Sequence, residues 1–218
     1  LFAPTPIASP RSRPSPGTIL PLSFDNFRSP AALARFLLTA AILLALDLAT
    51  KHYAFAHLLE GMRVSPSGRI EVYSRQPDPQ VIPGIIHLHL TVNQGAVFGS
   101  FQGFRWMFVA VSIGAIVFLG YLFAGHRERI VQLLLGMLLA GVLGNLYDRL
   151  AFGYVRDMIF ALPRWPDLFP YIFNVADMLL VCGVAALIVH SLLHPARARK
   201  PAADVPVPAP RQKTEPHP

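Results

Sequence analysis

Long apolar runs dominate the chain. A helix needs about 20 mostly apolar residues to cross the hydrocarbon core of a bilayer. Four runs, residues 32–50, 106–124, 130–147 and 171–193, come close to this length and carry few charged positions. The pattern therefore predicts an all-α integral membrane protein with four transmembrane helices, and an even number of spans places both termini on one side.

A different pattern follows the first run. Apolar and polar side chains alternate there, with Ile86, Leu88, Leu90 and Val92 separated by His87, His89, Thr91 and Asn93. A period of two is typical of a half-buried strand. Between the first and second spans we therefore expect a small extracytoplasmic β-rich segment that rests on the outer leaflet.

Both ends of the chain lack apolar runs. Residues 1–30 are rich in Pro, Ser and Arg, and residues 195–218 are basic and rich in Pro and Ala. Such segments bury too little apolar surface to fold alone. We predict a disordered extension at 1–30, a four-helix membrane domain at 31–194 and a disordered tail at 195–218.

The basic residues indicate the orientation, because cytoplasmic flanks of membrane helices retain more Lys and Arg. Placing both termini and the short turn between the second and third runs inside leaves eight of the nineteen basic residues outside. The eleven inside are Arg11, Arg13, Arg28, Arg35, Arg127, Arg129, Arg197, Arg199, Lys200, Arg211 and Lys213. The excess is modest, and it favours cytoplasmic termini.

Composition agrees with a membrane protein. Hydrophobic residues make up 53% of the chain and charged residues 14%, and the mean hydropathy is +0.46. The net charge of +7 does not indicate nucleic acid, because the basic residues flank apolar runs and do not form a polar basic surface. The single cysteine, Cys182, excludes an internal disulfide and a thiolate metal cluster, and its apolar neighbours predict a buried thiol.

Four carboxylates fall on one side of this topology. Asp47 and Asp148 lie at the outer ends of outgoing helices, and Asp177 lies near the outer end of an incoming helix. Asp157, in the connection that follows the third run, is on the same side. Asp177 is a candidate for chemistry by default, because an ionisable group inside a span costs about 2.5–3.5 kcal/mol on insertion scales.

Asp177 lies seven residues into the fourth run, and Asn174 shares its helix face, so the amide can orient the carboxyl group. The competing interpretation is a polar pair that only holds helices together.

The third run ends in a polar cluster. Gly136, Ala140 and Gly144 form a smooth stripe for close helix packing. Asn145 and Asp148 share a face, and Arg149 follows. For Asp148 and Arg149 we favour an ion pair or capping cluster that fixes the loop over a role in chemistry.

Asp157 lies in an apolar loop among Tyr154, Val155, Met158 and Ile159, where poor solvation and a second carboxylate raise the pKa. Two such carboxylates can share a proton, one activating water while the other polarises a carbonyl group, as in aspartic proteases. Taken alone, Asp157 is equally compatible with a solvated loop charge.

Other chemistry has weaker support. His87 and His89 lie on one strand face but lack a third ligand, so we expect no metal and no cofactor.

The motifs resemble those of the lipoprotein signal peptidases, also called signal peptidase II, from about residue 47 to residue 193. They are Asp47-Leu-Ala-Thr-Lys51, Asn93-Gln-Gly-Ala-Val-Phe-Gly99, Gly144-Asn-Leu-Tyr-Asp-Arg149, Gly153-Tyr-Val-Arg-Asp157 and Phe173-Asn-Val-Ala-Asp177.

The resemblance implies an aspartic endopeptidase of the bacterial inner membrane. Its implied substrates are diacylglyceryl-modified prolipoproteins, cleaved before the lipidated cysteine at the outer face, and membrane lipids are further partners. Asp157 and Asp177 are the implied catalytic dyad, and we expect a monomer. The implied supporting residues are Asn93, Gly95, Asn145, Asp148, Arg149, Asn174 and Asp47.

Three features depart from the family pattern: Ala140 stands where a glycine is usual, Arg156 stands where an apolar residue is usual, and residues 60–80 are longer than usual. Two other classes remain possible. A small ion- or proton-coupled transporter needs polar residues along the full depth of its spans, whereas here they cluster at one end. If the protein were a noncatalytic assembly factor, the carboxylates of Asp157 and Asp177 would have no chemical role.

Overall fold

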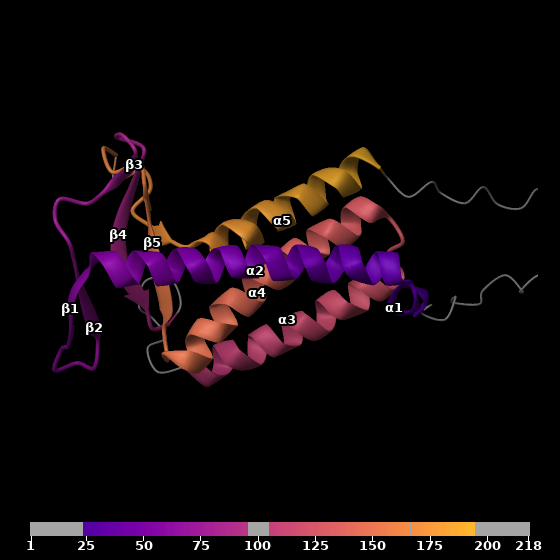
Figure 1. Ribbon diagram of the computed structural model, residues 1–218, viewed down its shortest axis with the longest axis horizontal. Helices are drawn as coiled ribbons and strands as arrows, with labels where there is room; N and C mark the ends of the chain where they lie inside the picture. The colour runs from indigo at the N-terminus through magenta and orange to yellow at the C-terminus, as the bar shows by residue number, and fades with distance from the viewer. Residues whose placement is uncertain (1–23, 96–104, 166, 195–218) are drawn as a thin grey trace, which may run out of the picture.

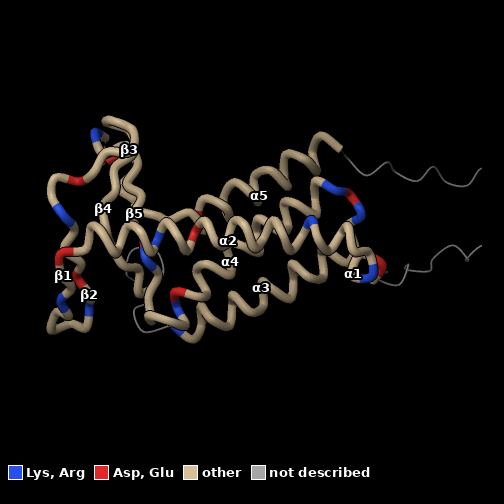
Figure 2. Tube along the Cα trace, in the orientation of Figure 1, with Lys and Arg blue, Asp and Glu red and all other residues tan. Residues whose placement is uncertain are grey.

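The computed structural model describes residues 24–95, 105–165 and 167–194. Four of its helices are long and apolar enough to cross a membrane, as predicted: α2 (Pro30–Leu58), α3 (Arg105–Gly125), α4 (Arg129–Ala151) and α5 (Val175–Leu193). The strands lie together at one end of this bundle, and the short helix α1 (Asp25–Arg28) lies at the other (Figure 1). Charged residues gather at the two ends and leave the middle of the helices uncharged (Figure 2).

Helix α4 is the centre of the bundle. In its apolar window 61% of residues are buried, against 17–22% in the other three helices. Small residues allow close contact on two sides: Gly136 lies against the backbone of Phe36 in α2, and Gly141 lies against α5 at Ala176 and Leu180. Phe36 and Phe123 stack at 4.5 Å between ring centroids within the same core. Gly144 of the predicted stripe lies against Asp47 of α2, so with Gly136 it makes the stripe a packing surface, whereas Gly141 lies outside the stripe.

The outward faces of α2, α3 and α5 remain apolar and exposed, as lipid contact requires. Cys182 lies on such a face of α5, so the prediction of a buried thiol is wrong. Apolar neighbours in the sequence do not distinguish burial in protein from exposure to lipid.

In the part of the chain that the structure describes, six strands form two antiparallel sheets. β1 (Leu59–Val64) and β2 (Ile70–Ser74) make a hairpin that directly follows α2. β3 (Gln80–Ile82), β4 (Ile86–Asn93), β5 (Val155–Ala161) and β6 (Ile172–Phe173) form the second sheet in that order. The predicted strand at 86–93 is confirmed as β4. The β-rich part is larger than predicted, because the connection between α4 and α5 contributes two strands.

Two predicted locations change as a result. Asp157 lies in strand β5, where it pairs with Thr91 of β4, and not in a loop. Asp177 is the third residue of α5 and not the seventh of a span, because residues 172–173 are strand and Asn174 caps the helix. The two apolar residues of β6 lie just before the apolar helix, so hydropathy alone does not show this boundary.

The N-terminal boundary also differs. Residues 25–28 are helical, and Asn26 donates from Nδ2 to the carbonyl oxygens of Phe123 (2.5 Å) and His126 (2.8 Å) at the end of α3. The prediction of disorder is wrong for this stretch, because one buried amide satisfies two carbonyl groups that α3 leaves free at its end. Residues 1–23 and the predicted tail at 195–218 lie outside the described residues.

Candidate active site

A buried lysine joins two carboxylates at the strand end of the bundle. Lys51 and Asp47 are one helical turn apart on α2, with Nζ 2.9 Å from Oδ2. The same Nζ lies 3.4 Å from Oδ2 of Asp148 at the end of α4, and all three side chains are 0% exposed. Oδ1 of Asp47 accepts from the backbone N–H of Ala176 at 2.8 Å, so this cluster also holds the first turn of α5.

Asp148 fixes strand β5. Its Oδ1 accepts from Nε and Nη2 of Arg156 at 3.2 and 2.8 Å, and its Oδ2 accepts from the Arg156 backbone N–H at 2.9 Å. The Arg156 guanidinium lies 4.4 Å from the centroid of the Phe152 ring. A two-pronged pair with a third backbone bond is among the stronger polar contacts. Asp148 thus positions the strand that carries Asp157.

Arg149 has different partners from its neighbour Asp148. Nη1 donates to the backbone carbonyl of Asn145 at 3.3 Å, and the guanidinium lies 5.0 Å from the centroid of the Phe108 ring. It is close enough to Asp157 and Asp177 for its charge to act on both.

Two asparagines connect Asp157 to Asp177. Asn174 donates from Nδ2 to Oδ1 of Asp157 at 2.6 Å, and its Oδ1 accepts from the backbone N–H of Asp177 at 3.0 Å. Oδ2 of Asp177 accepts from the Asn174 backbone N–H at 3.3 Å, which completes a capping box at the start of α5. Asn145 donates from Nδ2 to Oδ1 of Asp177 at 2.8 Å. Residues of β5, α4 and the start of α5 therefore form one hydrogen-bonded network that contains both carboxylates.

The two carboxylates have different surroundings. Asp157 is 3% exposed, whereas Asp177 is only partly buried and accepts two hydrogen bonds at a helix N-terminus, which favour a negative charge. Burial, and then the charge of Asp177, raises the pKa of Asp157 to about 8. Of the two carboxyl groups, Asp157 is therefore the one whose surroundings favour the protonated form.

Formal charges at the site agree with one held proton. The cluster contains four carboxylates, Asp47, Asp148, Asp157 and Asp177, against three cations, Lys51, Arg149 and Arg156. A proton on Asp157 makes the cluster neutral, which reduces the cost of burying it.

Asn93 and Gly95 lie beside this network. Asn93 ends β4 opposite Val155, two residues from Asp157, and its Oδ1 accepts from the backbone N–H of Gly95 at 3.1 Å. Within the described part of the chain, no hydrogen bond joins either residue to the two carboxylates.

The sequence interpretation missed two residues. Lys51 appeared only within the first motif, although its spacing of four from Asp47 indicates a shared helix face. Arg156 appeared only as a departure from the family pattern, and nothing local in the sequence indicates its pairing with Asp148.

The histidine alternative gains no support. Nδ1 of His89 lies 2.9 Å from Oδ2 of Asp78, and among the described residues no group of three His, Cys, Asp or Glu side chains is placed to hold a metal.

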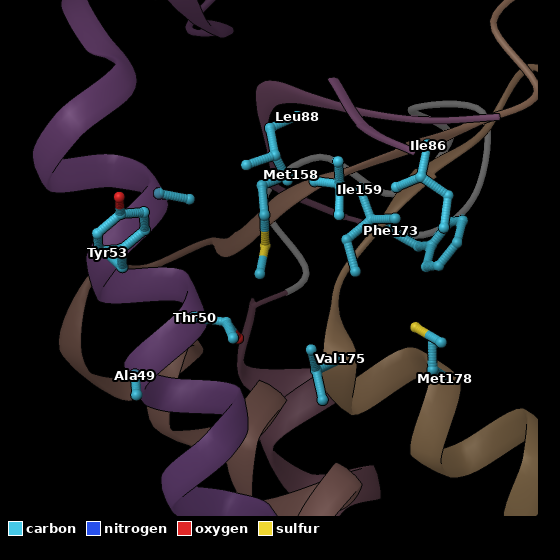
Figure 3. Close-up of a pocket in the computed structure, with 12 residues that line it drawn as sticks. Ala49, Thr50, Tyr53, Ile86, Leu88, Met158, Ile159, Phe173, Val175 and Met178 are labelled. Atoms are coloured by element: carbon cyan, nitrogen blue, oxygen red, sulfur yellow. The ribbon is translucent and has the colours of Figure 1, made fainter. Parts of the chain in front are cut away.

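An apolar cavity of about 580 Å³ lies where α2, α5 and the second sheet meet, and neither Asp157 nor Asp177 is among its lining residues. Side chains from α2, the second sheet and the first turns of α5 face it (Figure 3). Met158 follows Asp157 directly, and Val175 and Met178 flank Asp177 on either side in sequence. The complete lining is Ala49, Thr50, Tyr53, Ala54, Val81, Ile86, Leu88, Met158, Ile159, Phe173, Val175 and Met178.

Similar proteins identify the family. The family model of signal peptidase (SPase) II matches residues 39–193, well over half of the chain. A lipoprotein signal peptidase of Gloeobacter violaceus is 33% identical over 186 residues, which cover 83% of this chain and 92% of that protein. The lipoprotein signal peptidase of Microcystis aeruginosa is 37% identical over 122 residues, or 54% of this chain and 74% of that protein.

Solved structures agree with this assignment. Two bacterial membrane enzymes are similar, with TM-scores of 0.58 and 0.56 and sequence identities of 26% and 29%. The alignments cover 75% and 73% of this chain and 91% and 92% of those chains. The chain belongs to the signal peptidase II family of membrane proteases.

Proposed function

We propose that this multi-pass membrane protease cleaves the signal peptide of diacylglyceryl-modified prolipoproteins before the lipidated cysteine, with Asp157 and Asp177 as its catalytic pair. Membership of the signal peptidase II family supports the reaction. The observation that carries the residue assignment is the linkage of these two carboxylates through the amides of Asn145 and Asn174. An apolar cavity lined by their sequence neighbours Met158, Val175 and Met178 supports it.

The geometry supports an aspartic mechanism in which the two carboxylates have different roles. Asp177, ionised and partly accessible, takes a proton from water as the water oxygen attacks the scissile carbonyl carbon. Asp157, which holds its proton, donates it to the carbonyl oxygen and stabilises the charge that develops there. Collapse of the tetrahedral intermediate returns a proton to Asp157. The departing amine takes the proton from Asp177, so both groups regain their starting states.

The cavity suits the lipid-bearing end of the substrate. Its lining is almost wholly apolar, and it lies where α2 and α5 reach the sheet. Burying acyl methylene groups there contributes about 0.8 kcal/mol each. An acyl group or an apolar signal-peptide residue bound in this cavity holds the adjacent peptide bond near Asp157.

We also propose that both termini are cytoplasmic and that the sheet and the carboxylates lie at the outer face. Arg127 lies in the turn between α3 and α4, and Arg129 is the first residue of α4. Arg28 ends α1, and Arg35 lies near the start of α2. These helix ends lie opposite the strands, as expected for a cytoplasmic side (Figure 1). Reporter fusions after Arg127 are expected to indicate cytoplasm, and fusions near Ser74 the outer compartment. A cytoplasmic signal near Ser74 would place the carboxylates on the wrong side for an exported precursor.

The site is assembled from a single chain, so we expect the monomer to be active. The transporter alternative has no support, because the relatives found are peptidases and the charges gather at the two ends of the bundle.

The direct test is incubation of the purified protein in detergent with a synthetic diacylglyceryl-modified prolipoprotein peptide. We expect a single cut before the lipidated cysteine, identified by mass analysis of both products. The same peptide without the lipid is the control and is expected to be cut much more slowly. A lipidated peptide left intact by folded protein would refute the proposal.

Cleavage is expected to fall as pH rises through about 8, because the mechanism requires the proton on Asp157 and the folded protein holds that proton up to about this pH. The measurement is kcat/KM for the lipidated peptide across this range, because this ratio follows the ionisable groups of the free enzyme. Tryptophan fluorescence shows whether the fold is retained. A cleavage rate that stays constant well above pH 8 would show that the reaction does not depend on a proton held by Asp157.

Filling the cavity is expected to weaken substrate binding. Met178→Trp places a larger side chain against the lining, and loss of contact with two methylene groups raises KM by about tenfold or more. Ile188→Trp, on an exposed part of the same helix, is the matched control and is expected to leave KM unchanged. Equal KM values for Met178→Trp and the wild type would show that the substrate binds elsewhere.

A further inference from the structure

The side-chain amide of Asn145 has a defined direction. Its Oδ1 accepts from Nζ of Lys51 at 3.1 Å and from Nδ2 of Asn174 at 3.2 Å, while its Nδ2 donates to Asp177. Turning the amide by 180° would point an oxygen at the Asp177 carboxylate and an NH₂ group at two other donors. This direction matters for the proposed reaction, because only one orientation supplies a hydrogen bond to the carboxylate that activates water.

Lys51 is the partner best placed to fix that direction. Its ammonium group carries three N–H donors, and three acceptors surround it: Asp47 at 2.9 Å, Asp148 at 3.4 Å and Asn145 at 3.1 Å. The lysine side chain is 0% exposed, so water does not replace any of these contacts.

Asn174 is less able to fix the amide. Its Nδ2 makes the longer contact to Asn145, at 3.2 Å, and also donates to Asp157 at 2.6 Å. An ammonium ion next to the amide oxygen gives a charge-assisted bond, which is roughly twice as strong as a neutral one. Of the two donors to Asn145 Oδ1, Lys51 therefore has the larger effect.

We propose that Lys51 is a positioning residue for proteolysis, and that its ammonium group fixes the Asn145 amide so that Nδ2 always donates to Asp177. The inference rests on the proposed function. Among the described residues Lys51 makes no hydrogen bond to Asp157 or Asp177. Its charge acts on Asp157 through space, whereas its hydrogen-bonded route to Asp177 runs through Asn145. Without the ammonium group, both orientations of the amide become accessible and the Asp177 carboxylate loses its fixed donor.

A double-mutant cycle on kcat tests this route. Lys51→Met and Asn145→Ala are each expected to lower kcat by about 100-fold, the cost typical of losing one oriented donor in an active site. KM is expected to change little, because neither residue lines the cavity. The double variant is expected to lose only about threefold more than either single variant, since residues that act as one unit are non-additive.

Three further variants complete the test: one restores a donor, one replaces a variant that does not fold, and one is the control. Lys51→Gln retains an N–H donor without the charge and is expected to recover much of the lost kcat. Lys51→Met on an Asp47→Asn background leaves no unpaired Asp47 charge and is used if the single variant does not fold. His52→Asn, at the exposed neighbouring position, is the control with unchanged activity.

Additive losses in the cycle, or folded Lys51→Met protein with near-normal kcat, would overturn the inference and leave Lys51 a purely structural residue. Wild-type protein that does not cleave the lipidated peptide would instead refute the proposed function. The two failures are thus distinguished by the activity of the wild type.

Discussion

Replacing either Asp157 or Asp177 with Asn is expected to reduce cleavage of the lipidated peptide by at least about 10⁴-fold, the scale seen when a residue of a catalytic unit is lost. Asparagine keeps the size of the side chain but cannot give up or take up the proton that the mechanism moves. The double variant is expected to lose little more than either single variant, because one missing proton carrier already stops the reaction. The measurement is single-turnover cleavage followed by mass analysis.

The variants are expected to fold. Removing a buried carboxylate at Asp157 does not leave a cation without a partner, since Arg156 keeps Asp148. Glu71→Gln, an exposed carboxylate of the β1–β2 hairpin, is the control and should cleave at the wild-type rate. Near-normal turnover by Asp157→Asn would end the dyad assignment, and Asp148 would become the next candidate to pair with Asp177.

Gly136→Ala is expected to destabilise the bundle by about 1–3 kcal/mol, the usual cost of overpacking. A Cβ atom at this position would lie 2.5 Å from the backbone oxygen of Phe36, and a backbone atom cannot move aside as a side chain can. Helices α2 and α4 would have to separate, and the contact between Lys51 and Asn145 spans that interface. We therefore expect lower thermal stability in detergent together with lower kcat.

The matched control is Gly120→Ala on α3. A Cβ atom there meets nothing within 4 Å, so the variant should unfold at the wild-type temperature or slightly above it. Equal melting temperatures for Gly136→Ala and Gly120→Ala would show that α2 and α4 tolerate a larger separation than the structure has.

Much of the fold could be predicted from the sequence, because the bilayer restricts which sequences can span it. A spanning segment must be apolar over about 20 residues and must satisfy its own backbone hydrogen bonds, so four runs became four helices. The alternation at residues 86–93 predicted strand β4 because a period of two is typical of a strand, although the strand itself is half-buried along nearly its whole length. Because charged side chains are excluded from the lipid-facing middle of a span, the four carboxylates were expected at one end of the helix bundle.

Hydropathy was less informative about secondary structure and burial in segments that pack against other parts of the protein. Hydropathy described β5 as a loop, because the first half of this strand is buried on both faces and has no clear period. It merged β6 with the fourth helix, because two apolar residues are too few to show a period. It also predicted burial for Cys182, since an apolar neighbourhood has the same pattern whether lipid or protein covers it.

By itself, the sequence determined the four spans, the position of one strand, the concentration of acidic residues at one end and the motifs that identify the family. Only the tertiary structure decided which of these residues meet. Lys51 reaches Asn145 across 94 positions, and Asp47 reaches the backbone of Ala176 across 129. Such contacts depend on how α2 and α5 cross α4, and that crossing is set by packing at Gly136, Gly141 and Gly144. Local patterns report what surrounds a residue, whereas the partners of a buried charge follow from the geometry of the whole bundle.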